Sequence, residues 1–93
     1  MKNKKINSVR IKLDNLDNKL LDLIKKRTSL VNQILKAKKF KKQIVDKKRI
    51  KVILKRIRKK SQQRKIDTKL TNRIWKSMIY SYIDYEYRNF KKR

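Results

Sequence analysis

The chain has 93 residues, which is the length of one domain. Its 32 Lys and Arg against 7 Asp and Glu give a formal charge of +25, yet 38% of the residues are hydrophobic, too many for a purely solvated basic tail. The sequence contains no Gly, His or Cys, which excludes glycine-rich phosphate loops, zinc fingers, Ser-His-Asp or Cys-His catalysis and thiolate metal sites. We therefore expect one all-α domain over residues 1–93, with no metal and no cofactor.

The first predicted element is a long helix over about residues 6–40. Its apolar residues recur at alternating three- and four-residue steps, the spacing of a helix that buries one stripe. This stripe consists of Ile6, Val9, Leu13, Leu16, Leu20, Leu23, Leu30, Ile34 and Ala37. Such a helix would be about 50 Å long, whereas a compact monomer of this length has a radius of gyration of about 12–13 Å. We infer that a second copy covers the stripe, as in an intertwined homodimer.

Two shorter helices are predicted after a loop over residues 38–43. The second helix begins at about Val45 and ends within the polar run 59–65, and its inner face carries Ile50, Ile53, Leu54 and Ile57. Asp67 and Thr68 are N-cap candidates for the third. The inner face of the third helix carries Leu70, Ile74, Trp75, Met78, Ile79, Tyr82, Ile83, Glu86 and Phe90.

The sequence gives no sign of a membrane segment. No apolar run approaches the roughly 18 residues of a membrane span, and the Lys-rich start is not followed by the apolar region of a secretory signal. The lack of Cys fits a reducing compartment. We therefore expect a cytoplasmic protein with no membrane partner.

Some cations interrupt the apolar stripes, where an unpaired buried charge would be costly. Arg27 falls where the stripe of the first helix calls for an aliphatic residue. Lys38 follows eleven residues later, about 20° around the helix, and therefore shares its face. Arg10 lies about 100° off that face, so it can join the same site only from a partner chain.

Two carboxylates accompany these cations. Asp46, Arg49 and Ile53 share one face of the second helix, and Glu86, the only Glu in the chain, lies in line with the apolar stripe of the third. Each residue also has an ordinary interpretation: Arg27 as a snorkelling side chain, Asp46 as a helix cap or surface pair, and Glu86 as an exposed residue. Together they predict a pocket for a small ligand with two negative groups.

These residues resemble the all-helical chorismate mutase family, the intertwined three-helix dimers of the AroQ class. The resemblance covers most of the chain and rests on Val9-Arg10, LDNLDNKLL at 13–21, Arg27 with Leu30 and Val31, Lys36-Ala37-Lys38, Asp46-x-x-Arg49, Asp67, Ile74-Trp75, Met78-Ile79 and Ile83-x-x-Glu86. It implies rearrangement of chorismate to prephenate, a shikimate-pathway step toward aromatic amino acids. That pericyclic reaction requires no nucleophile, metal or cofactor.

The resemblance also implies roles for individual residues. Arg27, Arg49 and Arg10 of the partner subunit would bind the two carboxylates of the substrate. Substrate contacts are further implied for Lys38, Asp46, Ile53, Tyr82, Ile83 and Glu86.

Three of these implied contacts concern the reacting atoms and the ring. Lys38 would donate to the ether oxygen as negative charge develops there, and Asp46 would accept from the ring hydroxyl. Glu86 would contact the same ether oxygen and could donate to it only when protonated, so we expect activity to favour mildly acidic pH. Lys38, Glu86 and Arg27 are thus the predicted catalytic residues.

Some positions depart from the mutase pattern. Ile50 stands where the family often has Glu, Tyr82 stands where a small polar residue is common, and the loop before Asp46 looks about one residue short. The first two features look more like the isochorismate pyruvate lyase branch of the same fold, which makes salicylate and pyruvate. Asp46 favours the mutases, so we predict a mutase and keep the lyase as the alternative.

A basic helical nucleic-acid-binding protein is the alternative from another class. A charge of +25 attracts nucleic acid whatever the evolved function, and the aromatic residues near the C-terminus could stack on bases. Three of those five aromatics fall on or near the apolar stripe, however, and no nucleic-acid-binding motif is present. We therefore expect nucleic acid to bind only non-specifically.

Overall fold

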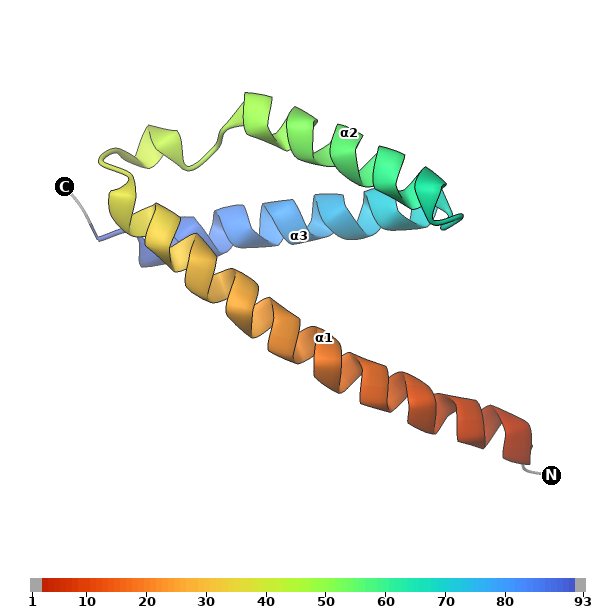
Figure 1. The fold of residues 1–93 in the computed structure, drawn as a ribbon. Helices are drawn as coiled ribbons and strands as arrows, with labels where there is room; N and C mark the ends of the chain where they lie inside the picture. The colour runs from red at the N-terminus through yellow and green to blue at the C-terminus, as the bar shows by residue number, and fades with distance from the viewer. Residues whose placement is uncertain (1–2, 92–93) are drawn as a thin grey trace. The chain divides into compact units, whose positions relative to one another are not determined.

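The computed structural model describes residues 3–91, which form helices joined by short connections. The elements are α1 (Lys4–Ala37), the 3₁₀-helix η1 (Lys41–Gln43), α2 (Lys47–Gln63) and α3 (Thr68–Asn89) (Figure 1). Residues 3–91 contain no strand, so the all-α prediction with one long and two shorter helices is confirmed. The chain divides into two compact units, one ending at Gln33 and the other beginning at Ile34.

The first unit is helical from Lys4 and consists of most of α1. Its apolar stripe forms as predicted, but in the single chain nearly all of its side chains face solvent. Leu16 and Leu20 are 54% and 53% exposed, and Leu23 is 58% exposed. Full burial of each of these leucine side chains would stabilise the protein by about 1.5–3 kcal/mol.

The predicted end of α1 was three residues too late. Lys38 still donates its backbone N–H to the carbonyl oxygens of Ile34 and Leu35. The next two backbone N–H groups, those of Lys39 and Phe40, instead donate to the side-chain oxygen of Gln43 at 2.7 and 2.8 Å. This diverts the chain into η1, so the predicted loop over 38–43 contains a short 3₁₀-helix.

The helix α2 begins and ends through side-chain and backbone caps. Its N-cap is Asp46, whose carboxylate accepts from the backbone N–H of Arg49 at 3.0 Å. It ends at Gln63, within the polar run 59–65 as predicted. It ends in a Schellman motif: the N–H groups of Lys65 and Ile66 donate to the carbonyls of Gln62 and Ser61. Lys65 takes a positive φ of 56° there, because the chain has no Gly for that position.

The second unit contains a small core, and its helices α2 and α3 pack against each other. The carboxylate of Asp67 accepts from the backbone N–H groups of Lys69 and Leu70, so the predicted cap of α3 is confirmed. Ser61 and Thr71 share a buried hydrogen bond of 2.8 Å between the helices. The buried apolar residues are Leu35, Ile44 and Ile79.

The predicted inner faces of α2 and α3 are confirmed only in part. All four apolar residues of the α2 face are half-buried. On α3, Ile79 and Glu86 are buried, and five others of that face are half-buried. Leu70 and Ile74, which we expected to face inward, are 55% and 46% exposed in the single chain, because α2 packs against another side of this end of α3, where Thr71 is buried against Ser61.

Candidate active site

The centre of the candidate site is an ion pair between Lys38 and Glu86. The ammonium nitrogen of Lys38 lies 2.8 Å from the Oε1 atom of Glu86. Their side chains are only 18% and 10% exposed. The pair joins the residue just after α1 to the last turns of α3, which are 48 positions apart in the sequence. The inward orientation predicted for Glu86 is therefore confirmed.

Burial makes this pair more informative than an exposed one. Removing a charge from water costs several kcal/mol, so a charged side chain is retained in such a place only with a partner or a function. By contrast, the pair of Arg88 and Asp84 lies on the surface of α3, with side chains 63% and 69% exposed. Exposed pairs of that kind contribute about 0–1 kcal/mol. The Lys38–Glu86 pair is thus the better candidate for chemistry.

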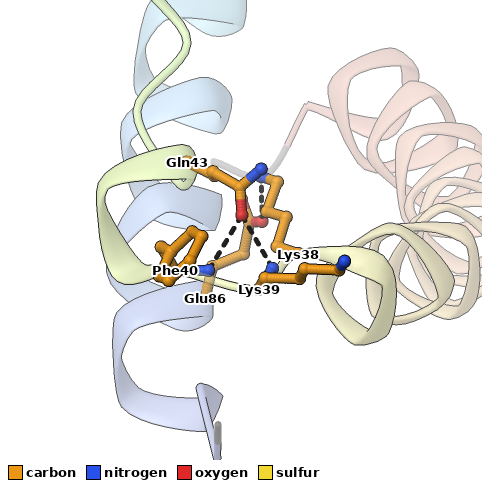
Figure 2. A network of polar contacts seen from close by, with 5 residues as sticks. All are labelled: Lys38, Lys39, Phe40, Gln43 and Glu86. Atoms are coloured by element: carbon orange, nitrogen blue, oxygen red, sulfur yellow. Dashed lines mark hydrogen bonds and ion pairs between the residues drawn. The ribbon is translucent and has the colours of Figure 1, made fainter. Parts of the chain in front are cut away.

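Gln43 is the residue of this site that sequence analysis did not find. Its side-chain oxygen accepts the backbone N–H groups of Lys39 and Phe40 and ties η1 to the residues directly after Lys38 (Figure 2). The backbone that carries Lys38 is therefore fixed on one side by α1 and on the other by Gln43. The only signal in the sequence was a neutral amide at the end of a basic run.

An open hollow of about 600 Å³ adjoins the pair. Its lining residues are Lys38, Gln43, Val45, Asp46, Lys47 and Lys48. Three cations and one carboxylate face a space large enough for a small metabolite. The structure thus places Lys38 and Asp46, two predicted site residues, on the same hollow.

Asp46 and Arg49 form the N-terminal cap of α2. A cap was the ordinary interpretation of Asp46 in the sequence. Asp46 lies before the helix, as its cap, and its Oδ1 atom is held by the backbone N–H of Arg49. A carboxylate has further lone pairs, so capping leaves Asp46 able to accept from a ligand. Arg49 is exposed. Its contact with a substrate stays a prediction.

The remaining predicted contacts lie on the paired helices or on α1. Ile53 is half-buried on α2, as are Tyr82 and Ile83 on α3. In the first unit, Arg27 is half-buried and Arg10 is exposed. The roles of these two arginines in holding carboxylates stay predictions.

Two further properties of the described residues concern metal binding and membrane insertion. Within residues 3–91, no group of three or more acidic, His or Cys side chains could hold a metal ion. No helix in the same range is long and apolar enough to cross a membrane.

Comparison with protein families assigns the chain. The family described as chorismate mutase type II matches residues 9–87, which is most of the sequence. The protein belongs to this family, and the match indicates chorismate mutase activity, an isomerase reaction. The matched range contains every predicted site residue, from Arg10 to Glu86. Comparisons with curated proteins and with solved structures found no match.

Proposed function

We propose that the protein rearranges chorismate to prephenate in a site formed around Lys38 and Glu86. The observation that carries the proposal is the buried ion pair at 2.8 Å, within the range that matches the family. A pericyclic rearrangement needs positioning and charge stabilisation, and these side chains supply both. The site requires no bound metal or cofactor.

In the proposed mechanism, Lys38 stabilises charge that exists only in the transition state. As the C–O bond of the substrate breaks, negative charge grows on the ether oxygen, and the ammonium group of Lys38 donates to it. A donor already in place costs no reorganisation at that moment, and one such interaction is worth about 10²–10³ in rate. Glu86 holds the ammonium in the free site and, when protonated, donates to the same oxygen.

We propose that the active form is a homodimer in which each site receives Arg10 of the partner subunit. The exposed leucine stripe of α1 supports this proposal, since a second copy supplies a stripe of the same composition and length. Arg27, Arg49 and the partner's Arg10 would hold the two substrate carboxylates. Asp46 would accept from the ring hydroxyl, with Ile53, Tyr82 and Ile83 against the ring.

Product analysis with two substrates tests the activity. The purified protein is incubated with chorismate and, separately, with isochorismate. We expect prephenate from chorismate; salicylate and pyruvate from isochorismate would instead assign the lyase reaction that Ile50 and Tyr82 favour. The variant Lys38→Met should lose about 10² or more in kcat/KM, while the exposed control Lys59→Ala should keep wild-type activity.

Loss of Lys38 leaves Glu86 buried without its partner, which could unfold the chain. The double variant Lys38→Met/Glu86→Gln removes that unpaired charge, and thermal unfolding is recorded for both variants. A folded double variant with full mutase activity would exclude Lys38 from catalysis.

Mixed dimers test the shared site. Arg10→Ala and Arg27→Ala chains, each inactive alone, are unfolded together and refolded at equal concentration. Half of the dimers then contain both chains, and each of these has one intact site, so the mixture should recover about one quarter of wild-type activity. If no activity returns although mixed dimers form, Arg10 and Arg27 do not act across the interface.

A further inference from the structure

Two rows of cations run along the paired helices, apart from the candidate active site. The first row is Lys51, Lys55 and Arg58 on α2, and the second is Lys69, Arg73 and Lys76 on α3. In both rows the spacing is i, i+4, i+7, which places the three residues on one face of the helix. All six side chains are exposed.

Among residues 3–91, no carboxylate forms an ion pair with these rows. Residues 47–83 contain 14 Lys and Arg against a single acid, Asp67. The carboxylate of Asp67 accepts from two backbone N–H groups at the start of α3. None of the six cations forms an ion pair with any residue in the range 3–91. The rows therefore form a positively charged surface that attracts polyanions.

The two rows meet at a second open hollow, of about 430 Å³. Its lining residues are Leu54, Lys55, Arg58, Thr68, Lys69 and Asn72. It shares no lining residue with the hollow beside Lys38. Three of its six lining residues are cations, two are uncharged polar residues, and none is acidic or aromatic. Such a lining suits phosphate groups and offers no surface on which a base could stack.

We propose that these two rows and the hollow between them bind the phosphodiester backbone of a nucleic acid, independently of mutase activity. Successive cations in each row rise about 6 and 4.5 Å along the helix, so one row can neutralise several neighbouring phosphates. Binding through backbone charges alone is independent of sequence. The rest of the chain is also basic, but we assign the contact to this surface and not to the net charge of the whole chain.

Equal charge removal at two places tests the proposal. The variant Lys55→Gln/Arg58→Gln/Lys69→Gln removes the three cations that line the hollow. The control variant Lys4→Gln/Lys25→Gln/Lys91→Gln removes the same amount of charge from exposed positions elsewhere. Binding of a fluorescent 20-nucleotide RNA of mixed sequence is followed by anisotropy between 50 and 300 mM salt. We expect the first variant to weaken binding more than tenfold and to reduce the slope of log K against log salt by about 2, as for three lost phosphate contacts.

The control variant should weaken RNA binding less than threefold, and both variants should keep wild-type mutase activity. Equal weakening by the two variants would assign RNA binding to net charge and overturn the proposal. The proposal would also be overturned if the Lys55/Arg58/Lys69 variant bound anionic phospholipid vesicles more weakly than the wild type, while RNA binding was the same for the wild type and both variants. Because mutase activity is measured separately, failure of this proposal leaves the proposed function standing.

Discussion

The first 30 residues of α1 and the unit that begins at Ile34 use their apolar side chains in different ways. In α1, leucine after leucine on one stripe is more than half exposed in the single chain. In the second unit, Ile44 and Ile79 are buried, and even polar groups such as Ser61 and Thr71 are buried with a hydrogen bond between them. The second unit buries a small core within one chain, whereas no residue of 3–33 in the first unit is buried.

This difference is the basis of the proposed homodimer. An apolar stripe along a helix of 34 residues is unfavourable when it is exposed to water. A second helix with the same pattern can bury it. The second unit instead holds the one buried ion pair found in residues 3–91, and its geometry is fixed by contacts within the chain. We therefore expect changes in α1 to act through assembly and changes near Lys38 to act on chemistry.

The largest effect is expected from charges on the α1 stripe. Leu16→Asp/Leu20→Asp should abolish the dimer, because each exposed leucine would lose about 1.5–3 kcal/mol of burial on association, and activity should fall with it. Analytical ultracentrifugation and a mutase assay measure the two outcomes. Asn15→Asp/Asn18→Asp changes the charge equally off the stripe and should leave both unchanged. A fully active dimer of the Leu16/Leu20 variant would contradict the assignment of the stripe.

A smaller effect is expected at Gln43, which we place as a positioning residue for Lys38. Gln43→Leu removes the oxygen that holds two backbone N–H groups, and kcat should fall about tenfold with little change in KM. Gln43→Glu keeps an acceptor and should recover most of kcat.

A double-mutant cycle separates positioning from general damage at Gln43. In the Lys38→Met background, Gln43→Leu should cause no further loss of kcat, because the group that it positions is already absent. A further tenfold loss in that background would mean that Gln43 acts on the fold and not on Lys38.

The next effect concerns the charge at position 86. An ionised Glu86 would repel the negative charge growing on the ether oxygen, whereas the side-chain amide of Glu86→Gln is neutral and can donate a hydrogen bond to it. Glu86→Gln should therefore keep or raise kcat/KM, whereas Glu86→Leu, which can neither donate nor accept, should lower it about tenfold or more. Equal kcat/KM for the two variants would exclude Glu86 from the reaction. Circular dichroism checks that both variants fold.

The smallest effect is expected at the turn after α2, within the self-contained unit. Lys65 has a φ of 56°, a region that costs a residue with a side chain about 1–2 kcal/mol. Lys65→Gly should raise the free energy of unfolding by up to about 1 kcal/mol, with unchanged mutase activity. Lys59→Gly, inside α2, should lower it by about 1 kcal/mol. Urea unfolding measures both, and a destabilised Lys65→Gly variant would show that the positive φ of Lys65 is not costly.

Much of this protein can be predicted from residue order alone. The steps of three and four residues in α1, the cap at Asp67 and the single Glu in line with an apolar face all depend on local spacing, and all have the expected structure. Local spacing failed at the end of α1, which was predicted at about Phe40 and lies at Ala37. The backbone N–H groups of Lys39 and Phe40 donate to Gln43 further along the chain, and no Gly or Pro marks this boundary in the sequence.

The sequence by itself determined the helical class, the stripes and the inward face of Glu86, because helical periodicity follows from the order of apolar residues. Only the tertiary structure decided that Lys38 meets Glu86 at 2.8 Å and that Gln43 holds the backbone beside it. Those contacts join residues that no local rule relates, and they form only when the end of α1, η1 and α3 come together in three dimensions.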